Sequence, residues 1–282
     1  MNFRYYLQRI LLQLLGRKRI VVDNLPWGDR FVLNLERAVD RQIYLRRFEP
    51  METKIVSAMV DQGSVCVDVG ANIGYYTSLM ANCVGDDGYV IAFEPGRQIQ
   101  PWLTVNLDIN KRGDRVIVLG KAASNAESNV VFYECEDAAY SSTLVGATDY
   151  ETERRRYNVE TVRLDATVGE LGFMDKVSLI KVDVEGGEAL VIAGAEQLIA
   201  RSKPVLIVEY FHLGLRGQSG NKSEFIRHLI DFGYRGFFLN KKQAKVEEFD
   251  QPYFEGNLIF IHSTKAEKID ELKRLNLYGD QD

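Results

Sequence analysis

The chain has 282 residues, of which 46% are hydrophobic and 27% charged, a size and balance that suit one α/β domain with an extension and an inserted segment. Its net charge is −5, whereas proteins that bind nucleic-acid phosphates usually carry a positively charged surface. The composition therefore argues against a nucleic-acid partner. The three cysteines, Cys66, Cys83 and Cys135, have the spacing of neither a metal site nor a disulfide framework, and we expect reduced thiols in a cytoplasmic protein.

Within residues 5–19, the stretch at 5–15 is rich in apolar side chains, but it is too short to span a bilayer. Basic residues follow it and no small-residue cleavage site is present, which is unlike a signal peptide. We expect an amphipathic helix that packs on its own domain or on a second subunit of a homo-oligomer; peripheral contact with a membrane surface is the alternative. Residues 1–50 are therefore predicted to form an N-terminal extension, helical at its start, ahead of a domain at 51–282.

From residue 65 onward, short apolar runs alternate with apolar residues at helical spacing, a pattern typical of βαβ units and a mostly parallel sheet with helices on both faces. The pattern predicts core strands at 65–69, 89–93, 116–119, 177–182 and 204–208. It predicts helices at 75–83, 98–109, 188–200 and 223–232. Two last strands, at 234–239 and 257–262, are expected to form an antiparallel pair at one edge.

An insertion is predicted at about 125–165, between the third and fourth core strands. Two short strands, at 130–133 and 159–164, flank a polar stretch there. Segments at this edge of a sheet lie over the ligand site, so we expect the insertion to help form it.

The turn after the first core strand reads Asp68-Val69-Gly70-Ala71-Asn72-Ile73-Gly74, at the sheet edge where ligands bind. Gly70 and Gly74 permit a tight turn and a close backbone approach, and the following helix presents amides to a negative group. A dinucleotide would need G-x-G-x-x-G, and the Asp68 carboxylate opposes a pyrophosphate but suits a cation. S-adenosylmethionine carries an ammonium and a sulfonium, so we expect Asp68, Gly70, Asn72 and Gly74 to bind this cofactor.

Two further segments complete the expected cofactor site. Glu94 ends the second core strand, 20 residues after Gly74, where an acid accepts hydrogen bonds from ribose hydroxyls. Ala122 and Ala123 follow the third strand, and their small side chains would leave room for an adenine ring. An ordinary loop is the alternative for this last segment.

Carboxylates also follow the fourth and fifth core strands. Methyl transfer to an alcohol requires a positioned acceptor, and a base helps to remove the hydroxyl proton. Asp183 and Glu185 are candidates for that base, for binding a divalent cation that polarises the hydroxyl, or for capping the next helix. Glu209 is the third catalytic candidate, because a carboxylate that ends an apolar strand is costly without a partner. His212 could be a base or a surface residue.

Four segments resemble the FkbM family of methyltransferases. They are Val67–Thr77, Val90–Pro95, Ile180–Glu188 and Pro204–Glu209. The resemblance implies a Rossmann-like, seven-stranded methyltransferase core that uses S-adenosylmethionine for oxygen methylation, often of sugar hydroxyls in glycans, glycolipids or natural products. One departure is Gly187, where that family often has alanine.

The resemblance further implies that Asp68, Gly70 and Glu94 contact the cofactor, and that Asp183 and Glu185 lie beside the reacting centre. These motifs do not fix the acceptor, so methylation of another small molecule or of a protein is an alternative. Two alternatives remain. The first is a nucleotide-cofactor oxidoreductase or epimerase, and the second is a non-catalytic partner subunit. The missing G-x-G-x-x-G argues against the first, and the retained acids argue against the second.

Overall fold

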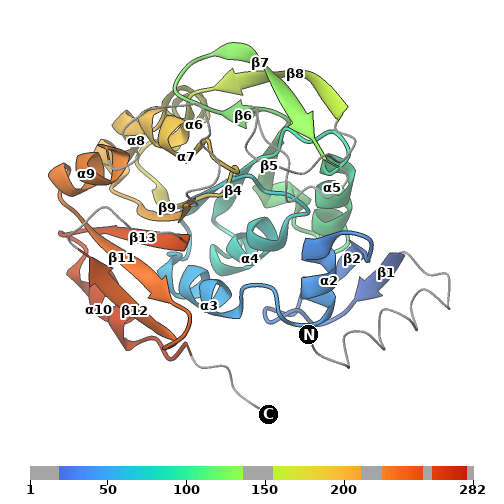
Figure 1. Cartoon of the computed structure of the whole chain (residues 1–282), viewed down its shortest axis with the longest axis horizontal. Helices are drawn as coiled ribbons and strands as arrows, with labels where there is room; N and C mark the ends of the chain where they lie inside the picture. The colour runs from blue at the N-terminus through green and yellow to red at the C-terminus, as the bar shows by residue number, and fades with distance from the viewer. Residues whose placement is uncertain (1–18, 136–154, 211–223, 250–255, 278–282) are drawn as a thin grey trace.

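The computed structural model describes residues 19–135, 155–210, 224–249 and 256–277, and its centre is a sheet of eight strands (Figure 1). In spatial order, the strands are β12 (Lys245–Phe249), β11 (Tyr234–Asn240), β13 (Gly256–His262), β10 (Val205–Tyr210), β9 (Val177–Val182), β3 (Val65–Val69), β4 (Tyr89–Phe93) and β5 (Val116–Leu119). The strands from β10 to β5 are parallel, and β13 runs antiparallel to both of its neighbours. The prediction of a mostly parallel sheet with an antiparallel edge is confirmed.

The order of the strands reverses at the centre of this sheet. From β3 the chain proceeds to β4 and β5 on one side, and later to β9 and β10 on the other. A crevice therefore opens at the carboxyl ends of β3 and β9, where open α/β sheets bind their ligands. This position agrees with the expectation from the glycine turn.

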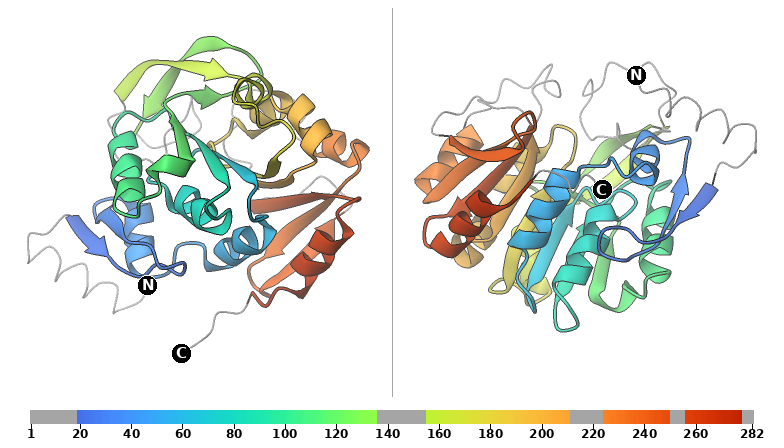
Figure 2. Two further views of the ribbon diagram at one scale, coloured as in Figure 1. Left: turned by 180° about the vertical axis from the view of Figure 1, so that it is seen from behind. Right: turned by 90° about the horizontal axis from the view of Figure 1, so that it is seen from below.

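Helices cover both faces of the sheet (Figure 2). One face carries α3 (Pro50–Met59), α4 (Tyr75–Cys83), α5 (Gln100–Asp108) and α10 (Ala266–Arg274); the other carries α6 (Leu164–Glu170), α7 (Glu188–Ala193), α8 (Glu196–Ser202) and α9 (Glu224–Asp231). Successive strand residues point to opposite faces, so Cys66 belongs to the first apolar cluster and Val67 to the second. By the same alternation, Asp68 faces α4.

One predicted helix is wrong: residues 188–200 form two helices, α7 and α8, with a break at Gly194. A Cβ atom at Gly194 would lie 2.0 Å from the Ser124 carbonyl oxygen, so the backbones meet there. The start of α8 is capped from a distant element, because the Asp165 carboxylate accepts hydrogen bonds from the Leu198 and Gln197 amides, at 2.9 and 3.3 Å. Apolar periodicity continues through the break, and the sequence pattern therefore does not show it.

The chain before α3 forms β1 (Arg19–Val22), β2 (Phe31–Asn34) and α2 (Ala38–Tyr44), none of which was predicted. The β1–β2 hairpin packs beside α5, because the Val32 amide donates to Asn106 Oδ1 at 2.8 Å. Strand β12 and helix α10 were also not predicted; β12 is an edge strand of mixed charge, with little apolar alternation.

The segment between β5 and β9 contains a small sheet of β6 (Ala122–Ala123), β8 (Arg155–Val162) and β7 (Ser128–Glu134). Residues 136–154 of the expected polar stretch, residues 5–18 of the expected N-terminal helix and His212 lie outside the described residues. Residues 155–158, also expected in the polar stretch, belong to β8. Within the part of the chain that the structure describes, no helix has the length and apolar character needed to cross a membrane.

Candidate active site

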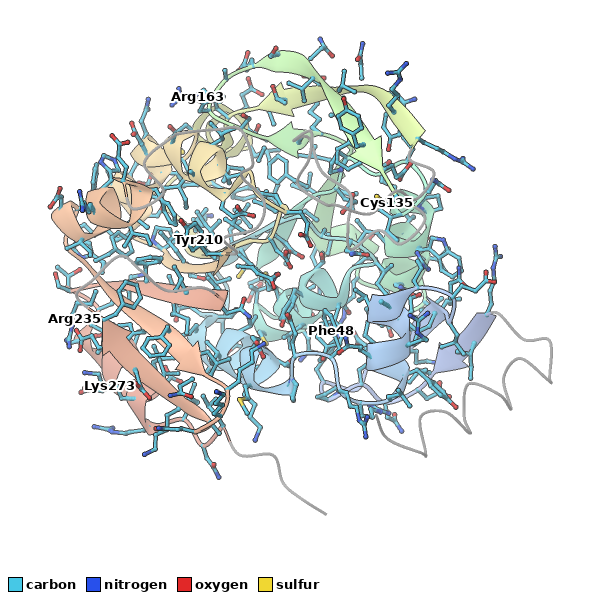
Figure 3. The ribbon with its side chains drawn as sticks, viewed as in Figure 1. Phe48, Cys135, Arg163, Tyr210, Arg235 and Lys273 are labelled. Carbon is cyan, nitrogen blue, oxygen red and sulfur yellow. The ribbon has the colours of Figure 1, made fainter. Side chains whose placement is uncertain are left out.

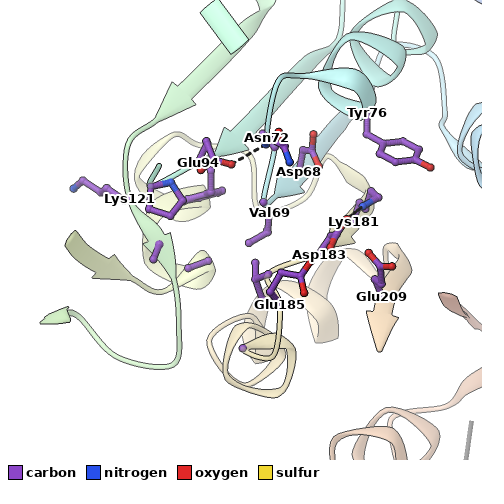
Figure 4. Close-up of a pocket in the computed structure, with 18 of the residues that line it drawn as sticks. Asp68, Val69, Asn72, Tyr76, Glu94, Lys121, Lys181, Asp183, Glu185 and Glu209 are labelled. Atoms are coloured by element: carbon purple, nitrogen blue, oxygen red, sulfur yellow. Dashed lines mark hydrogen bonds and ion pairs between the residues drawn. The ribbon is translucent and has the colours of Figure 1, made fainter. Parts of the chain in front are cut away.

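A cavity of about 460 Å³ opens at the carboxyl ends of β3, β4, β9 and β10 (Figure 4). This volume falls within the range of about 300–1,000 Å³ that is typical of small-molecule sites. Nine residues predicted for the cofactor or for catalysis line it: Asp68, Gly70, Asn72, Glu94, Ala122, Ala123, Asp183, Glu185 and Glu209. The small sheet of the insertion contributes Val130, Phe132 and Thr161 to its wall.

The glycine turn brings the ends of β3 and β9 into contact. Gly70 has φ +91°, and a Cβ atom there would lie 1.9 Å from the Asp183 carbonyl oxygen, so no larger residue fits. Gly74 is not among the lining residues. It has φ +91° at the start of α4, and its missing side chain makes room for Leu103, whose Cδ1 would lie 2.7 Å from a Cβ atom. Gly74 therefore serves packing in this structure.

Glu94 is fixed by backbone amides on both of its carboxylate oxygens. Oε2 accepts a hydrogen bond from the Asn72 amide and Oε1 from the Gly96 amide, each at 2.7 Å. The side chain is only 7% exposed, and burial raises its pKa to about 7. A carboxylate oxygen accepts more than one hydrogen bond, so both oxygens can still receive ribose hydroxyls.

Asp68 is buried at the floor of the cavity, with 1% of its surface exposed. The Thr77 hydroxyl on α4 donates to its Oδ2 at 2.5 Å. Burial raises the pKa of Asp68, and the nearby ammonium of Lys181 opposes that rise. Asp68 and Lys181 are register partners on β3 and β9, so both side chains lie on the same face of the sheet.

The end of β9 holds an ion pair. Lys181 Nζ lies 2.8 Å from Asp183 Oδ2, and the lysine is 3% exposed whereas the aspartate side chain is 27% exposed. Burial acts to lower the pKa of Lys181, but the carboxylates of Asp183 and Glu49 outweigh it and the pKa is raised. Burial acts to raise the pKa of Asp183, but Lys181 and a hydrogen bond with Glu209 hold it below its ordinary value. Asp183 is therefore an ionised carboxylate that still faces the cavity.

Glu209 has the opposite protonation state. Burial and the adjacent Asp183 carboxylate raise its pKa to about 10, so at neutral pH it is a carboxylic acid hydrogen-bonded to Asp183. The two side chains lie at the ends of neighbouring parallel strands, with Val208 paired to Val182 (Figure 4). Two acids whose pKa values are driven apart in this way can take different roles in one proton transfer.

Glu185 also lines the cavity, and its backbone has φ +56°. Burial, followed by the charge of Asp183, raises the pKa of Glu185 to about 8. At the start of α7, the Gly186 amide donates to Glu188 Oε1 at 2.8 Å. Glu188 is the first residue of α7, so its side chain holds the turn that precedes this helix. The capping role considered for Asp183 and Glu185 stays a prediction.

No pattern in the sequence indicated two residues that border Lys181, Glu49 and Tyr76. Glu49 precedes α3 with φ +41°, and its Oε2 accepts a hydrogen bond from the Tyr76 hydroxyl at 2.5 Å. The Tyr76 ring faces Lys181, with Nζ 4.5 Å from the ring centroid. Phe48, labelled in Figure 3, lines the same cavity and packs against Tyr75 with 4.8 Å between ring centroids. The proline at position 50 marks a helix start, but no local pattern connects residue 49 with Tyr76.

Among the described residues, no group of three or more His, Cys, Asp and Glu side chains is arranged to hold a metal ion. Oδ2 of Asp183 is paired with Lys181. The divalent cation considered from the sequence stays a prediction.

The cavity lies at the switch point of the sheet and is lined by the glycine turn and by carboxylates that end the parallel strands. The fold and this site together define the class of Rossmann-like, S-adenosylmethionine-dependent methyltransferases. The family model described as "Methyltransferase FkbM domain" matches residues 68–236, and the chain belongs to this family. Family membership sets aside the oxidoreductase or epimerase alternative.

Several solved structures share the fold. The methyltransferase FkbM from Methylobacillus flagellatus is 17% identical, with a TM-score of 0.46 and coverage of 79% of this chain and 52% of that chain. A SAM-dependent O-methyltransferase from Thermotoga maritima is 12% identical, with a TM-score of 0.39 and coverage of 89% of this chain and 80% of that chain. The O-methyltransferase from Bacillus cereus in complex with SAH is 13% identical, with a TM-score of 0.41 and coverage of 76% of this chain and 80% of that chain.

The chain thus spans about half the length of the Methylobacillus protein. No curated protein matches the sequence. At these identities and TM-scores, the structural relatives carry no argument about the acceptor.

Proposed function

We propose that the protein transfers a methyl group from S-adenosylmethionine to a hydroxyl of a sugar, glycan or natural-product acceptor. The observation that carries the proposal is the partly exposed Asp183 carboxylate, which pairs with Lys181 at 2.8 Å and lines the cavity beside the glycine turn and Glu209. A carboxylate in this position can accept the proton of a hydroxyl that is held in the cavity.

Six of the residues that line the cavity fit the cofactor. Glu94 would accept the ribose hydroxyls, Asp68 would face the ammonium, and Gly70 and Asn72 would bring backbone close to the amino-acid part. Ala122 and Ala123 would border the adenine. When bound, the cofactor supplies a methyl group on a positively charged sulfur, which keeps the electron pair of the broken S–C bond.

The remaining residues act on the acceptor. Asp183 takes the hydroxyl proton while the acceptor oxygen forms the new O–C bond, so the carboxylate becomes a carboxylic acid and later releases the proton to solvent. Glu209 donates its hydrogen bond to Asp183 and keeps that carboxylate oriented. Glu185, at the same edge, binds a second acceptor hydroxyl.

The side chains that line the cavity around Asp183 support a polyhydroxylated acceptor. Carboxyl groups of Asp183, Glu185 and Glu209 accept hydrogen bonds from neighbouring hydroxyls, and the aromatic ring of Phe48 offers an apolar face to a sugar ring. Acidic and aromatic side chains together suit a ring that has hydroxyls on its rim and C–H bonds on its faces.

The experiment has two stages. Calorimetric titration with S-adenosylhomocysteine, with NAD in parallel, is expected to show micromolar binding of the first alone. Methyl transfer from labelled S-adenosylmethionine is then measured on a panel of sugars and hydroxylated natural products, and the product is examined by mass spectrometry and NMR. A methyl ether supports the proposal; transfer only to nitrogen, sulfur or carbon acceptors, or binding of NAD instead, contradicts it.

The arrangement of the chain around this site is also proposed. We propose that residues 1–50 form an extension to a methyltransferase domain at 51–282, with an insertion at about 125–165. The extension contributes Phe48 and Glu49 to the wall of the cavity, and the insertion contributes Phe132. These lining residues support a role for both the extension and the insertion in acceptor binding. A cytoplasmic location and a homo-oligomeric state remain predictions from the sequence.

A further inference from the structure

Lys181 is held on one side by its own strand and by β3. Residues two apart on a strand share a face, and Lys181 Nζ lies 2.8 Å from Asp183 Oδ2. The register partner of Lys181 on β3 is Asp68, which adds a second carboxylate on that face. An ammonium has three N–H donors in a compact group, so it can pair with Asp183 while it faces other partners.

On the other side, Lys181 is enclosed by side chains from α4 and from the chain before α3. The ammonium lies 4.5 Å from the centroid of the Tyr76 ring, within the distance of a cation–π interaction. The Tyr76 hydroxyl in turn donates to Glu49 Oε2 at 2.5 Å, and this bond fixes the orientation of the ring. Glu49 lies before residue 68, where the match to the family model begins, so the enclosure depends on a segment outside that match.

We propose that Lys181 is a positioning residue for methyl transfer: its buried ammonium keeps the Asp183 carboxylate ionised and directed at the acceptor hydroxyl, and Glu49 and Tyr76 hold that ammonium in place. The proposal rests on the proposed function, because it assigns Asp183 as the group that takes the hydroxyl proton. Lys181 also lines the cavity, but it is only 3% exposed and its ammonium is paired with Asp183, so it acts through that carboxylate.

The charges around Asp183 explain why one lysine has this effect. The titratable groups that act on Asp183 or on Lys181 are Asp68 from β3, Glu209 from β10, Glu185 and Glu188 after β9, and Glu49 and Tyr76 from the elements opposite. All of these groups are acids. Lys241, which pairs with Glu52, also acts on Glu49 and Glu209, but the cation that acts on Asp183 is Lys181. Without Lys181, Asp183 would be left beside carboxyl groups, and it would take up a proton and lose its ability to accept another.

The test compares three substitutions at constant cofactor saturation. Lys181→Met removes the charge and approximately keeps the length, and Lys181→Arg keeps the charge. Lys268→Met is the matched control, because Lys268 is also largely buried and pairs with Asp61 at 2.9 Å, and neither residue lines the cavity. Calorimetry with S-adenosylhomocysteine and thermal unfolding report whether each variant is folded and binds cofactor.

For Lys181→Met we expect kcat to fall about 100-fold, the scale of a general-base contribution. We expect the acidic limb of the pH–kcat profile to move at least about one unit to higher pH, because a neutral side chain no longer stabilises the ionised form. Lys181→Arg is expected to recover at least about tenfold of the lost kcat. Lys268→Met is expected to keep the wild-type kcat and profile.

A second readout needs no acceptor. The protein is labelled with ¹³C-aspartate, and NMR follows the Asp183 carboxyl signal through a pH titration. This signal is identified by its absence from the spectrum of Asp183→Asn. Its midpoint is expected to rise in Lys181→Met and, by a smaller step, in Tyr76→Phe, which releases the ring that Glu49 orients over Lys181. Tyr76→Phe keeps the test decisive if Lys181→Met does not fold.

The two readouts separate the two proposals. If no hydroxyl acceptor is methylated but the Asp183 midpoint shifts as expected, the proposed function fails and the action of Lys181 on Asp183 stands. If hydroxyls are methylated but Lys181→Met keeps the wild-type kcat, pH profile and Asp183 midpoint, the positioning role is wrong. A loss of activity that follows only a loss of cofactor affinity also overturns it.

Discussion

Glu94, at the end of β4, accepts a hydrogen bond from the backbone amide of Asn72 at 2.7 Å, so the acid and the glycine turn form one structural unit. The bond joins positions 22 residues apart in the chain and fixes the distance between them. A ligand that spans the turn and the acid thus meets a preorganised site, which lowers the entropic cost of binding.

Glu94→Gln is expected to weaken S-adenosylhomocysteine binding by about 10- to 100-fold, because one carboxylate oxygen becomes an NH₂ group that cannot accept from a backbone amide or a ribose hydroxyl. Calorimetry measures the change in Kd. Glu248→Gln is the control, since Glu248 pairs with Arg235 and Lys273 far from the cavity (Figure 3). Equal affinities for wild type and Glu94→Gln would remove Glu94 from the cofactor site.

Asp183→Asn should separate binding from turnover. The asparagine keeps the shape of the side chain but cannot take a proton, so kcat is expected to fall about 100- to 1,000-fold while the Kd for S-adenosylhomocysteine changes less than about threefold. Asp175→Asn provides a control on the surface, where Asp175 pairs with Arg201. Wild-type turnover in Asp183→Asn would show that another group is the base.

Gly70→Ala tests the contact between the glycine turn and β9. The new Cβ would lie 1.9 Å from the Asp183 carbonyl oxygen at φ +91°, and we expect a loss of more than about 3 kcal/mol in the free energy of unfolding. Gly63→Ala is the matched control, because Gly63 has φ +75° and nothing within 4 Å of a Cβ atom. Its expected loss is about 1 kcal/mol, from the left-handed backbone alone. Similar losses for both, measured by urea unfolding, would contradict the predicted clash.

The protonation state of Glu209 predicts a pH dependence of stability. Its pKa is about 10 in the folded protein and ordinarily 4.5, so between these values the folded state holds a proton that the unfolded chain has released. Stability from this group therefore falls as pH rises through that window, by at most about 1.4 kcal/mol per unit.

Glu209→Gln, a neutral side chain that can still donate to Asp183, should remove this contribution. The variant is expected to gain stability relative to wild type as pH rises from 6 to 9, and urea unfolding at several pH values measures the difference. Parallel stability curves for the two proteins would show that Glu209 is ionised in the folded state.

The sequence determined the central part of this fold. Strands β3, β4, β5 and β9 were predicted with their observed bounds, because fully buried parallel strands are continuous apolar runs that end abruptly at polar residues. The same ends placed Asp68, Glu94, Asp183 and Glu209 at one edge, since all parallel strands of a sheet have their carboxyl ends on the same side. Cofactor class and family followed from these positions.

Only the tertiary structure decided which charges meet. The contacts from Glu49 to Tyr76 and from Tyr76 to Lys181 join residues that no local pattern relates, and so does the capping of α8 by Asp165. The protonation states of Asp183 and Glu209 likewise depend on burial and on the interaction between these two residues, which come from the adjacent strands β9 and β10. Periodicity reports which face of an element is apolar, whereas desolvation and Coulomb interaction depend on distances that exist only after the elements have packed.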